Sequence, residues 1–163
     1  MTAPADPTFE RQFGLGRDDY LAQIDFYAWT RHYHLFKDIC ASVQGDLFEV
    51  GTGDGVLKRC VQPLLPTSTA TDIHPKLLPN VLGDLCVHRP ELVGRFDVAV
   101  AAEVLEHLPF DRLALCIGHL RSYLKAGGRL FLTLPHRKAH LLLVTPRQRL
   151  SLSRRPWFAP GRR

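Results

Sequence analysis

The stretch EVGTGDG, residues 49–55, decides how the rest of the sequence is interpreted. It follows a short apolar segment, 46–50, that predicts a β-strand, and it precedes a segment, 56–65, that predicts a helix. Glycine accepts a positive φ and lets the backbone approach a ligand closely, and the first turn of the next helix offers free N–H groups. The stretch therefore predicts a ligand-binding loop, with a purely steric turn as the alternative.

Outward from this loop, strand and helix patterns alternate along the chain. Upstream, apolar and aromatic residues recur three or four positions apart over 19–43, which predicts one or two amphipathic helices. The aromatic residues between 26 and 36 either cap a ligand site or pack against the sheet. Repeated β-then-α order with short links predicts a parallel sheet covered by helices. The expected strands are 46–50, 67–73, 81–85, 96–101 and 129–134, the expected helices are 56–65 and 111–124, 75–81 is a short helix or turn, and 125–128 is a helix C-cap.

Three acidic residues stand where the first three expected strands end. The glycines are spaced GxGxG rather than GxGxxG, and Glu49 beside them would repel the pyrophosphate of a dinucleotide. Asp72 stands where a carboxylate can accept both hydroxyls of a ribose, and Asp84 can accept from an adenine amino group. The alternatives are solvated strand-end acids for Glu49 and Asp72, and a turn or helix N-cap residue for Asp84. The pattern favours a ligand that carries adenosine but no pyrophosphate.

Five segments resemble, in order and spacing, the successive motifs of class I S-adenosylmethionine-dependent methyltransferases, most closely the type 11 group. The resemblance covers roughly residues 45–135 and implies a Rossmann-like three-layer α/β sandwich with a mostly parallel sheet. That family's sheet has seven strands, and the short remainder after Pro135 predicts that the last one or two are missing. The chain is then a shortened member, a fragment, or a subunit whose sheet edge a partner covers. The five segments are EVGTGDG (49–55), TDIHP (71–75), GDL (83–85), FDVAVAAEVLEHLP (96–109) and LKAGGRLFLTLP (124–135).

The same resemblance implies that the cofactor is S-adenosyl-L-methionine and which residues contact it. It places the glycine loop and the residues after the fourth strand, 101–103, along the methionine part of the cofactor. It places Asp72 at the ribose, Ile73 against the adenine, and the residues of the third strand's end at the adenine edge. The expected cofactor-binding residues are Glu49, Gly51, Thr52, Gly53, Asp72, Ile73, Asp84, Leu85, Ala102 and Glu103.

The segment EVLEH, 103–107, brings three polar side chains with possible chemistry into five positions. Glu103, Glu106 and His107 are similar to the metal-binding ExxEH of small-RNA 3′-terminal 2′-O-methyltransferases, with His136 or His140 as a further ligand. Such segments are also ordinary in metal-free type 11 relatives, so we expect no metal. His107 is a candidate general base, since its ordinary pKa near 6.5 suits proton transfer. The catalytic residues stay unassigned, because methyl transfer depends mainly on in-line alignment of the acceptor with the sulfonium methyl.

The chain's net charge of +5 comes from its C-terminal part. Residues 136–163 contain eight Lys and Arg and no acid, whereas residues 1–135 contain 13 Lys and Arg against 16 Asp and Glu. A basic tail can attract nucleic acid, but nothing in it resembles an RNA-binding signature, so nucleic acid is not the favoured partner. We expect a flexible leader over 1–18, a cofactor-binding domain over 19–145, in which 139–144 is a short helix or strand, and a basic Arg- and Pro-rich tail over 146–163.

The remaining features indicate a cytoplasmic protein. The N-terminus does not resemble a signal peptide, no segment is apolar enough to span a membrane, and no membrane partner is expected. The cysteines, without a CxxC pair, read as buried reduced thiols; they are Cys40, Cys60, Cys86 and Cys116. We therefore predict an S-adenosylmethionine-dependent methyltransferase with an unidentified small-molecule acceptor, and a homodimer as one way to cover an exposed sheet edge. The alternatives are a truncated non-catalytic domain that binds cofactor or a partner, and an RNA 2′-O-methyltransferase.

Overall fold

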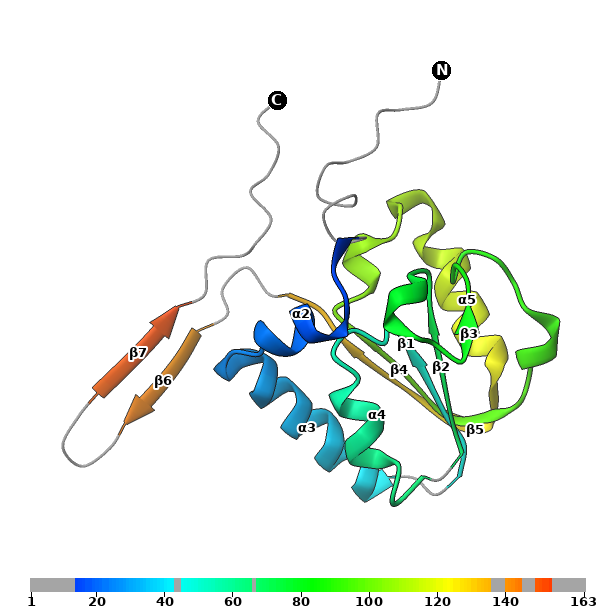
Figure 1. The fold of residues 1–163 in the computed structure, drawn as a ribbon. Coiled ribbons are helices and arrows are strands. Elements are labelled where there is room, and N and C mark those ends of the chain that lie inside the picture. The colour runs from blue at the N-terminus through cyan, green and yellow to red at the C-terminus, as the bar shows by residue number, and fades with distance from the viewer. Residues whose placement is uncertain (1–13, 43–44, 66, 136–139, 145–148, 154–163) are drawn as a thin grey trace. The chain divides into compact units, whose positions relative to one another are not determined.

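The computed structural model describes residues 14–42, 45–65, 67–135, 140–144 and 149–153. The chain forms two compact units, residues 1–133 and 134–163. Most of the predicted leader and much of the predicted basic tail lie outside the described residues, so the division into leader, domain and tail stays a prediction. In the first unit the elements are α2 (Arg17–Ala22), α3 (Phe26–Ser42), β1 (Leu47–Val50), α4 (Val56–Val61), β2 (Ser68–Asp72), β3 (Val81–Leu82), β4 (Phe96–Ala102), α5 (Leu113–Tyr123) and β5 (Leu124–Thr133), with 3₁₀ turns at Pro75–Leu77, Pro90–Leu92, Leu105–His107 and Phe110–Arg112 (Figure 1).

The five strands of this unit form one parallel sheet in the order β3-β2-β1-β4-β5. The chain begins in the middle of the sheet, moves outward to β3, and then crosses back to β4 on the other side of β1. In such open sheets, ligands bind beyond the carboxyl ends of the strands where the order reverses, here between β1 and β4. The predicted α/β fold with a parallel sheet is confirmed.

Each face of the sheet buries its own hydrophobic cluster, which makes three layers. Phe48 and Val50 of β1 pack with α5 on one face, whereas Leu47 packs with α3 and α4 on the other. Residues 98–101 of β4 alternate between the same two clusters and are fully buried, as the continuous apolar pattern predicts for a strand covered on both sides. Figure 1 shows α3 and α4 on one side of the sheet and α5 on the other.

The predicted C-cap over 125–128 is wrong. α5 ends at Tyr123 and β5 begins at once, with Leu124 opposite Phe96 and Arg129 opposite Val98. Residues 125–128 are therefore a bulge in β5 at the level of Asp97. Lys125 in this bulge forms ion pairs and does not cap the helix, because its Nζ lies 2.7 Å from Asp97 Oδ2 and 3.1 Å from Asp46 Oδ2.

The second unit contains an antiparallel hairpin of β6 (His140–Val144) and β7 (Arg149–Ser153). The expected short helix or strand over 139–144 is thus a strand. β7 falls within the segment predicted to be tail, where the alternation of RLSLS is the strand signal that the sequence analysis passed over. Among the helices that the structure describes, none has the length and apolar character needed to cross a bilayer.

The packing of α5 on the sheet can be tested at Leu120, which has no exposed surface and lies in the same cluster as Phe48. We expect Leu120→Ala to lower the free energy of unfolding by about 2–5 kcal/mol, because it removes buried methyl groups and leaves a cavity. The matched control is Leu115→Ala on the same helix, whose side chain is 52% exposed and whose loss should cost less than about 1 kcal/mol. Urea denaturation measures both, and equal costs would contradict the packing described.

Candidate cofactor site at the carboxyl edge of the sheet

The glycine loop after β1 needs glycine for two reasons. Gly51, Gly53 and Gly55 all have positive φ, at 79°, 41° and 68°, a region that other residues rarely adopt. At Gly51 a Cβ would also lie 2.5 Å from Cγ2 of Val104, which follows β4. The loop therefore holds the ends of β1 and β4 close together, at the place where the strand order reverses.

Asp72 lies at the end of β2 and is joined directly to this loop. Its Oδ2 accepts hydrogen bonds from the backbone N–H of Thr52, at 2.9 Å, and from Thr52 Oγ1, at 3.1 Å, while its Oδ1 accepts from the backbone N–H of His74, at 2.9 Å. The structure brings Thr52 and Asp72 together, as a common site requires. The half-buried Asp72 carboxylate is fixed in one orientation and is not a freely solvated acid.

The other predicted residues of this side follow β2 and β3. The N–H of Gly83 donates to the Asp72 carbonyl at 2.9 Å, which sets the end of β3 beside that of β2. Ile73 is 40% exposed, whereas the Leu85 side chain is buried in the cluster beneath α5. Asp84 accepts a hydrogen bond from the backbone N–H of Cys86 at 2.8 Å, which is the turn geometry that the sequence left as an alternative. Asp84 and Leu85 thus both have structural contacts of their own.

Glu49 is buried near the carboxyl end of β1, the central strand of the sheet. Burial, followed by the charges of Asp54 and Asp72, raises its pKa to about 8, against an opposing effect of Lys58 and Arg17. Its Oε2 has no hydrogen-bond partner among the described residues. A buried acceptor of this kind is costly unless a ligand satisfies it. Glu49 is therefore no solvated strand-end acid.

The turn after β4 carries a strained residue at the same edge. Glu103 has φ 55°, which is uncommon for a residue other than glycine and typical of functional turns. Its N–H donates to the Thr133 carbonyl of β5 at 3.1 Å, and its carboxylate lies 3.9 Å from Arg31 Nη1 of α3. Ala102, the last residue of β4, lies next to it against the cluster under α3 and α4. The expected pair Ala102 and Glu103 thus stands at the edge where Gly51 begins its turn.

The two remaining polar residues of EVLEH follow in the same turn. Burial raises the pKa of Glu106 to about 7, with a contribution from the charge of Glu103, and its Oε2 has no partner within the described part of the chain. Burial lowers the pKa of His107, whose Nε2 lies 3.9 Å from Glu106 Oε1. A neutral imidazole at neutral pH can accept a proton, so His107 as general base stays a hypothesis. In the described residues no three His, Cys, Asp or Glu side chains are placed to hold a metal ion; His136 and the side chain of His140 lie outside the description.

The helix α2 lies over the glycine loop, and the sequence analysis missed its contribution. Arg17, in the segment predicted to be leader, donates through Nη2 to the Leu77 carbonyl at 2.9 Å, and its buried Nε has no partner in the described ranges. The Tyr20 ring lies 3.9 Å from the position of a Cβ on Gly53, and burial together with the charge of Asp72 raises its pKa. Two acids in the first turn of α2 were the available signal of a helix start.

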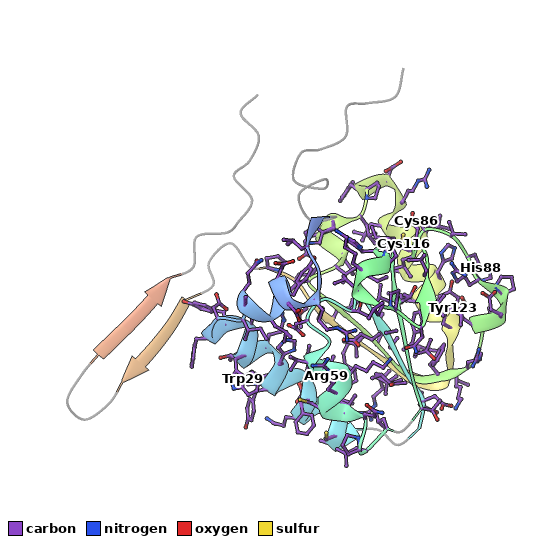
Figure 2. The ribbon with its side chains drawn as sticks, in the orientation of Figure 1. Trp29, Arg59, Cys86, His88, Cys116 and Tyr123 are labelled. Carbon is purple, nitrogen blue, oxygen red and sulfur yellow. The ribbon has the colours of Figure 1, made fainter. Side chains whose placement is uncertain are left out.

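α3 contributes a second set of polar side chains. His32 Nε2 donates to Asp54 Oδ2 at 2.9 Å, and Asp54 Oδ1 accepts from the N–H of Val56. Burial alone would raise the pKa of Asp54, but these hydrogen bonds lower it below its usual value. The predicted aromatic run divides: Phe36 packs against the sheet-facing cluster, whereas three rings are exposed, and Figure 2 shows Trp29 on the outer side of α3. The exposed rings are Phe26, Trp29 and Tyr33.

A cavity of about 180 Å³ opens beside the glycine loop. Thr52 and Gly55 line it together with the cations Arg17, Lys58 and Arg59, the last of which Figure 2 marks on α4. The charges of Lys58 and Arg17 also act on the buried Glu49 carboxyl. A ligand in this cavity would therefore meet cationic side chains.

The family can be assigned once this geometry is known. A family model described as a methyltransferase domain matches residues 21–159. The chain belongs to this methyltransferase family. The predicted resemblance is confirmed, and the glycine loop, the acid after β2 and the turn after β4 are parts of a methyltransferase domain. A comparison with curated protein sequences finds no match.

Solved methyltransferase structures share the fold. The N-methyltransferase NodS from Bradyrhizobium japonicum WM9, in complex with S-adenosyl-L-homocysteine, is 20% identical with a TM-score of 0.66, over 77% of this chain and 70% of that chain. The complex of DhpI with S-adenosylhomocysteine is 20% identical with a TM-score of 0.64, over 88% and 77%. CalS10 from Micromonospora echinaspora, an amino pentose methyltransferase, is 14% identical with a TM-score of 0.55, over 93% and 68%. At these identities the likeness shows the fold.

The effect on stability of the close contact at Gly51 can be measured separately from the effect of its positive φ. Gly51 and Gly127 have nearly the same φ, 79° and 81°, but a Cβ on Gly127 would meet nothing within 4 Å. We expect Gly127→Ala to cost about 1–2 kcal/mol for the left-handed backbone alone, and Gly51→Ala to cost clearly more because Val104 must move. Thermal unfolding of the two variants compares them. Equal shifts in Tm would contradict a tight contact between the loop and the turn after β4.

The buried carboxyl of Glu49 predicts a pH dependence. Because its folded pKa of about 8 lies above the usual 4.5, the native state binds a proton more tightly than the unfolded chain. The free energy of unfolding of wild type should therefore fall by about 1.4 kcal/mol per pH unit, relative to that of Glu49→Gln, as the pH rises from about 4.5 to about 8. Above about pH 8 the difference should level off. Denaturation of both proteins between pH 5 and 9 measures the difference. A stability difference between wild type and Glu49→Gln that does not change with pH would contradict the burial of Glu49 as an acid.

Proposed function

We propose that this methyltransferase transfers a methyl group from S-adenosyl-L-methionine to a small-molecule acceptor. One observation carries the proposal: Asp72 is hydrogen-bonded to Thr52 of the glycine loop at the reversal point of a parallel sheet. That arrangement joins a close backbone approach to a carboxylate placed for a ribose. The complexes of NodS and DhpI with S-adenosylhomocysteine support this cofactor.

The polar atoms beside the loop fit the amino-acid end of this cofactor. That end carries an ammonium group and a carboxylate, which require an acceptor and a donor. Glu49 Oε2 and Arg17 Nε are buried without partners among the described residues, and the charges of the two side chains act on one another. We assign the methionine part to the loop residues Gly51, Thr52 and Gly53 and to residues 101–103, which directly precede Val104 in the chain.

The adenosine part is assigned to the ends of β2 and β3. Each oxygen of Asp72 already accepts hydrogen bonds from the protein, and a carboxylate oxygen retains capacity for a ribose hydroxyl. The exposed side of Ile73 offers an apolar surface to the adenine ring. Because the Leu85 side chain is buried in the core, we assign its contact to the backbone, next to Asp84.

The acceptor is assigned to the side of β5, since the cofactor takes the ends of β1, β2 and β3 and, through residues 101–103, the end of β4. When bound, the cofactor supplies a methyl group on a positively charged sulfur. The chain's own part is to align the acceptor with that methyl and to take the proton that the acceptor loses, for which neutral His107 is the candidate. CalS10, named as an amino pentose methyltransferase, supports a small-molecule acceptor. A homodimer that covers the edge strand β5 stays a proposal.

The first experiment is calorimetric titration with S-adenosylhomocysteine, using wild type, Asp72→Ala and Asp38→Ala. Loss of the ribose-binding carboxylate should weaken binding by roughly 5- to 150-fold, whereas the exposed Asp38 of α3 should not matter. Circular dichroism confirms that each variant is folded. A folded wild type that does not bind at millimolar concentration, or an Asp72→Ala variant that binds as tightly as wild type, would refute the assignment.

A further inference from the structure

Two of the four cysteines contact each other on the face of the sheet covered by α5. Cys86 follows β3 and Cys116 lies on α5, and their sulfur atoms are 2.9 Å apart although 30 positions separate them in the chain. Figure 2 shows the two side chains next to each other. Since bonded sulfurs lie about 2.05 Å apart, the pair needs a shift of less than about 1 Å to form a bond.

The backbone on both sides of the pair is already held in place. The Cys86 N–H donates to Asp84, and the carbonyl of the intervening Leu85 accepts from His119 Nδ1 at 2.8 Å. His119 lies one turn after Cys116 on α5, so this hydrogen bond joins the loop to the helix next to the sulfur contact. The two sulfur atoms are therefore held close to each other by segments that are themselves joined.

Exposure distinguishes the two sulfurs. Cys116 has no exposed surface, whereas Cys86 is partly exposed. An external reagent can therefore reach Cys86 first, and Cys116 is placed to attack the product. Burial, the hydrogen bond with Cys116 and the charge of Asp84 raise the pKa of Cys86 to about 12. Because the thiolate is the nucleophile, the first step should be slow at neutral pH and faster in alkaline solution.

We propose that Cys86 and Cys116 are an oxidative modification site, at which a small-molecule disulfide converts the thiol pair into an intramolecular disulfide. In the first step Cys86 loses its proton and its sulfur attacks one sulfur of the small disulfide, which releases one thiol. In the second step Cys116 loses its proton and attacks the Cys86 sulfur, which releases the second thiol. The protein pair loses two electrons and two protons, and the small disulfide gains them. The new bond fastens the turn after β3 to α5.

The test uses the full chain with Cys40→Ser and Cys60→Ser, because both of those thiols are exposed and would react separately. Oxidised glutathione is added at pH 8.5, and the mass of the intact protein is followed. We expect a product lighter by two hydrogen atoms, and a Tm higher by about 10 °C, since the bond closes a long loop in the unfolded chain. Reduction with dithiothreitol should reverse both changes. Peptide mapping should find 86 joined to 116, a readout that needs no further variant.

The matched control adds Cys116→Ala to the same protein. It should accumulate glutathione on Cys86, with no loss of two hydrogens and no rise in Tm. Three results would overturn the proposal: a glutathione adduct that persists while Cys116 is present, a disulfide between two chains, or a pair that stays reduced under conditions in which unfolded protein oxidises. A cross-link between 86 and 116 without a rise in Tm would refute the claim that the bond fits the folded structure.

Discussion

The ladder between β1 and β4 is the constraint on which the rest of the structure depends. It pairs Val50 with Ala101, so both strands end at the same level and their turns open at one edge. Each strand is buried on both faces and no later adjustment can move one against the other without exposing a cluster. The position of Gly51 against Val104, and with it the width of the site, follows from this register.

Burial also changes the pKa of the carboxyl groups at the site. Glu49 lies near the end of β1 and Glu106 lies in the 3₁₀ turn that follows β4, and burial raises the pKa of each carboxyl into the neutral range. Neither finds a hydrogen-bond partner for its Oε2 among the described residues. A buried polar atom without a partner lowers the stability of the protein, and a bound group that supplies the partner would recover that stability. Asp54 is the contrast, since His32 and a backbone N–H satisfy it and lower its pKa.

The sequence was sufficient for the parts of the fold that local patterns determine. Apolar runs and glycine spacing predicted where most strands and the loop lie in the chain, because a buried strand and a tight turn each restrict their own residues. Contacts between distant residues were not accessible in this way. Residues 125–128 resemble a helix end in sequence, but they form a bulge in which Lys125 pairs with Asp97. Arg17 lies beside the glycine loop although its segment resembles a leader. The burial of Glu49 likewise depends on helices that the strand itself does not encode.

The same strand order determines when the chain can fold as it is synthesised. β1 is made before both of its neighbours in the sheet, which begin at Ser68 and Phe96. Parallel pairing between such distant segments is slow to form, and the face of β1 that carries Phe48 and Val50 lacks its cover until α5 has been made. The nascent chain must therefore carry β1 with its edge toward β4 unpaired until residue 102 has left the ribosome, the interval in which chaperone binding would matter most.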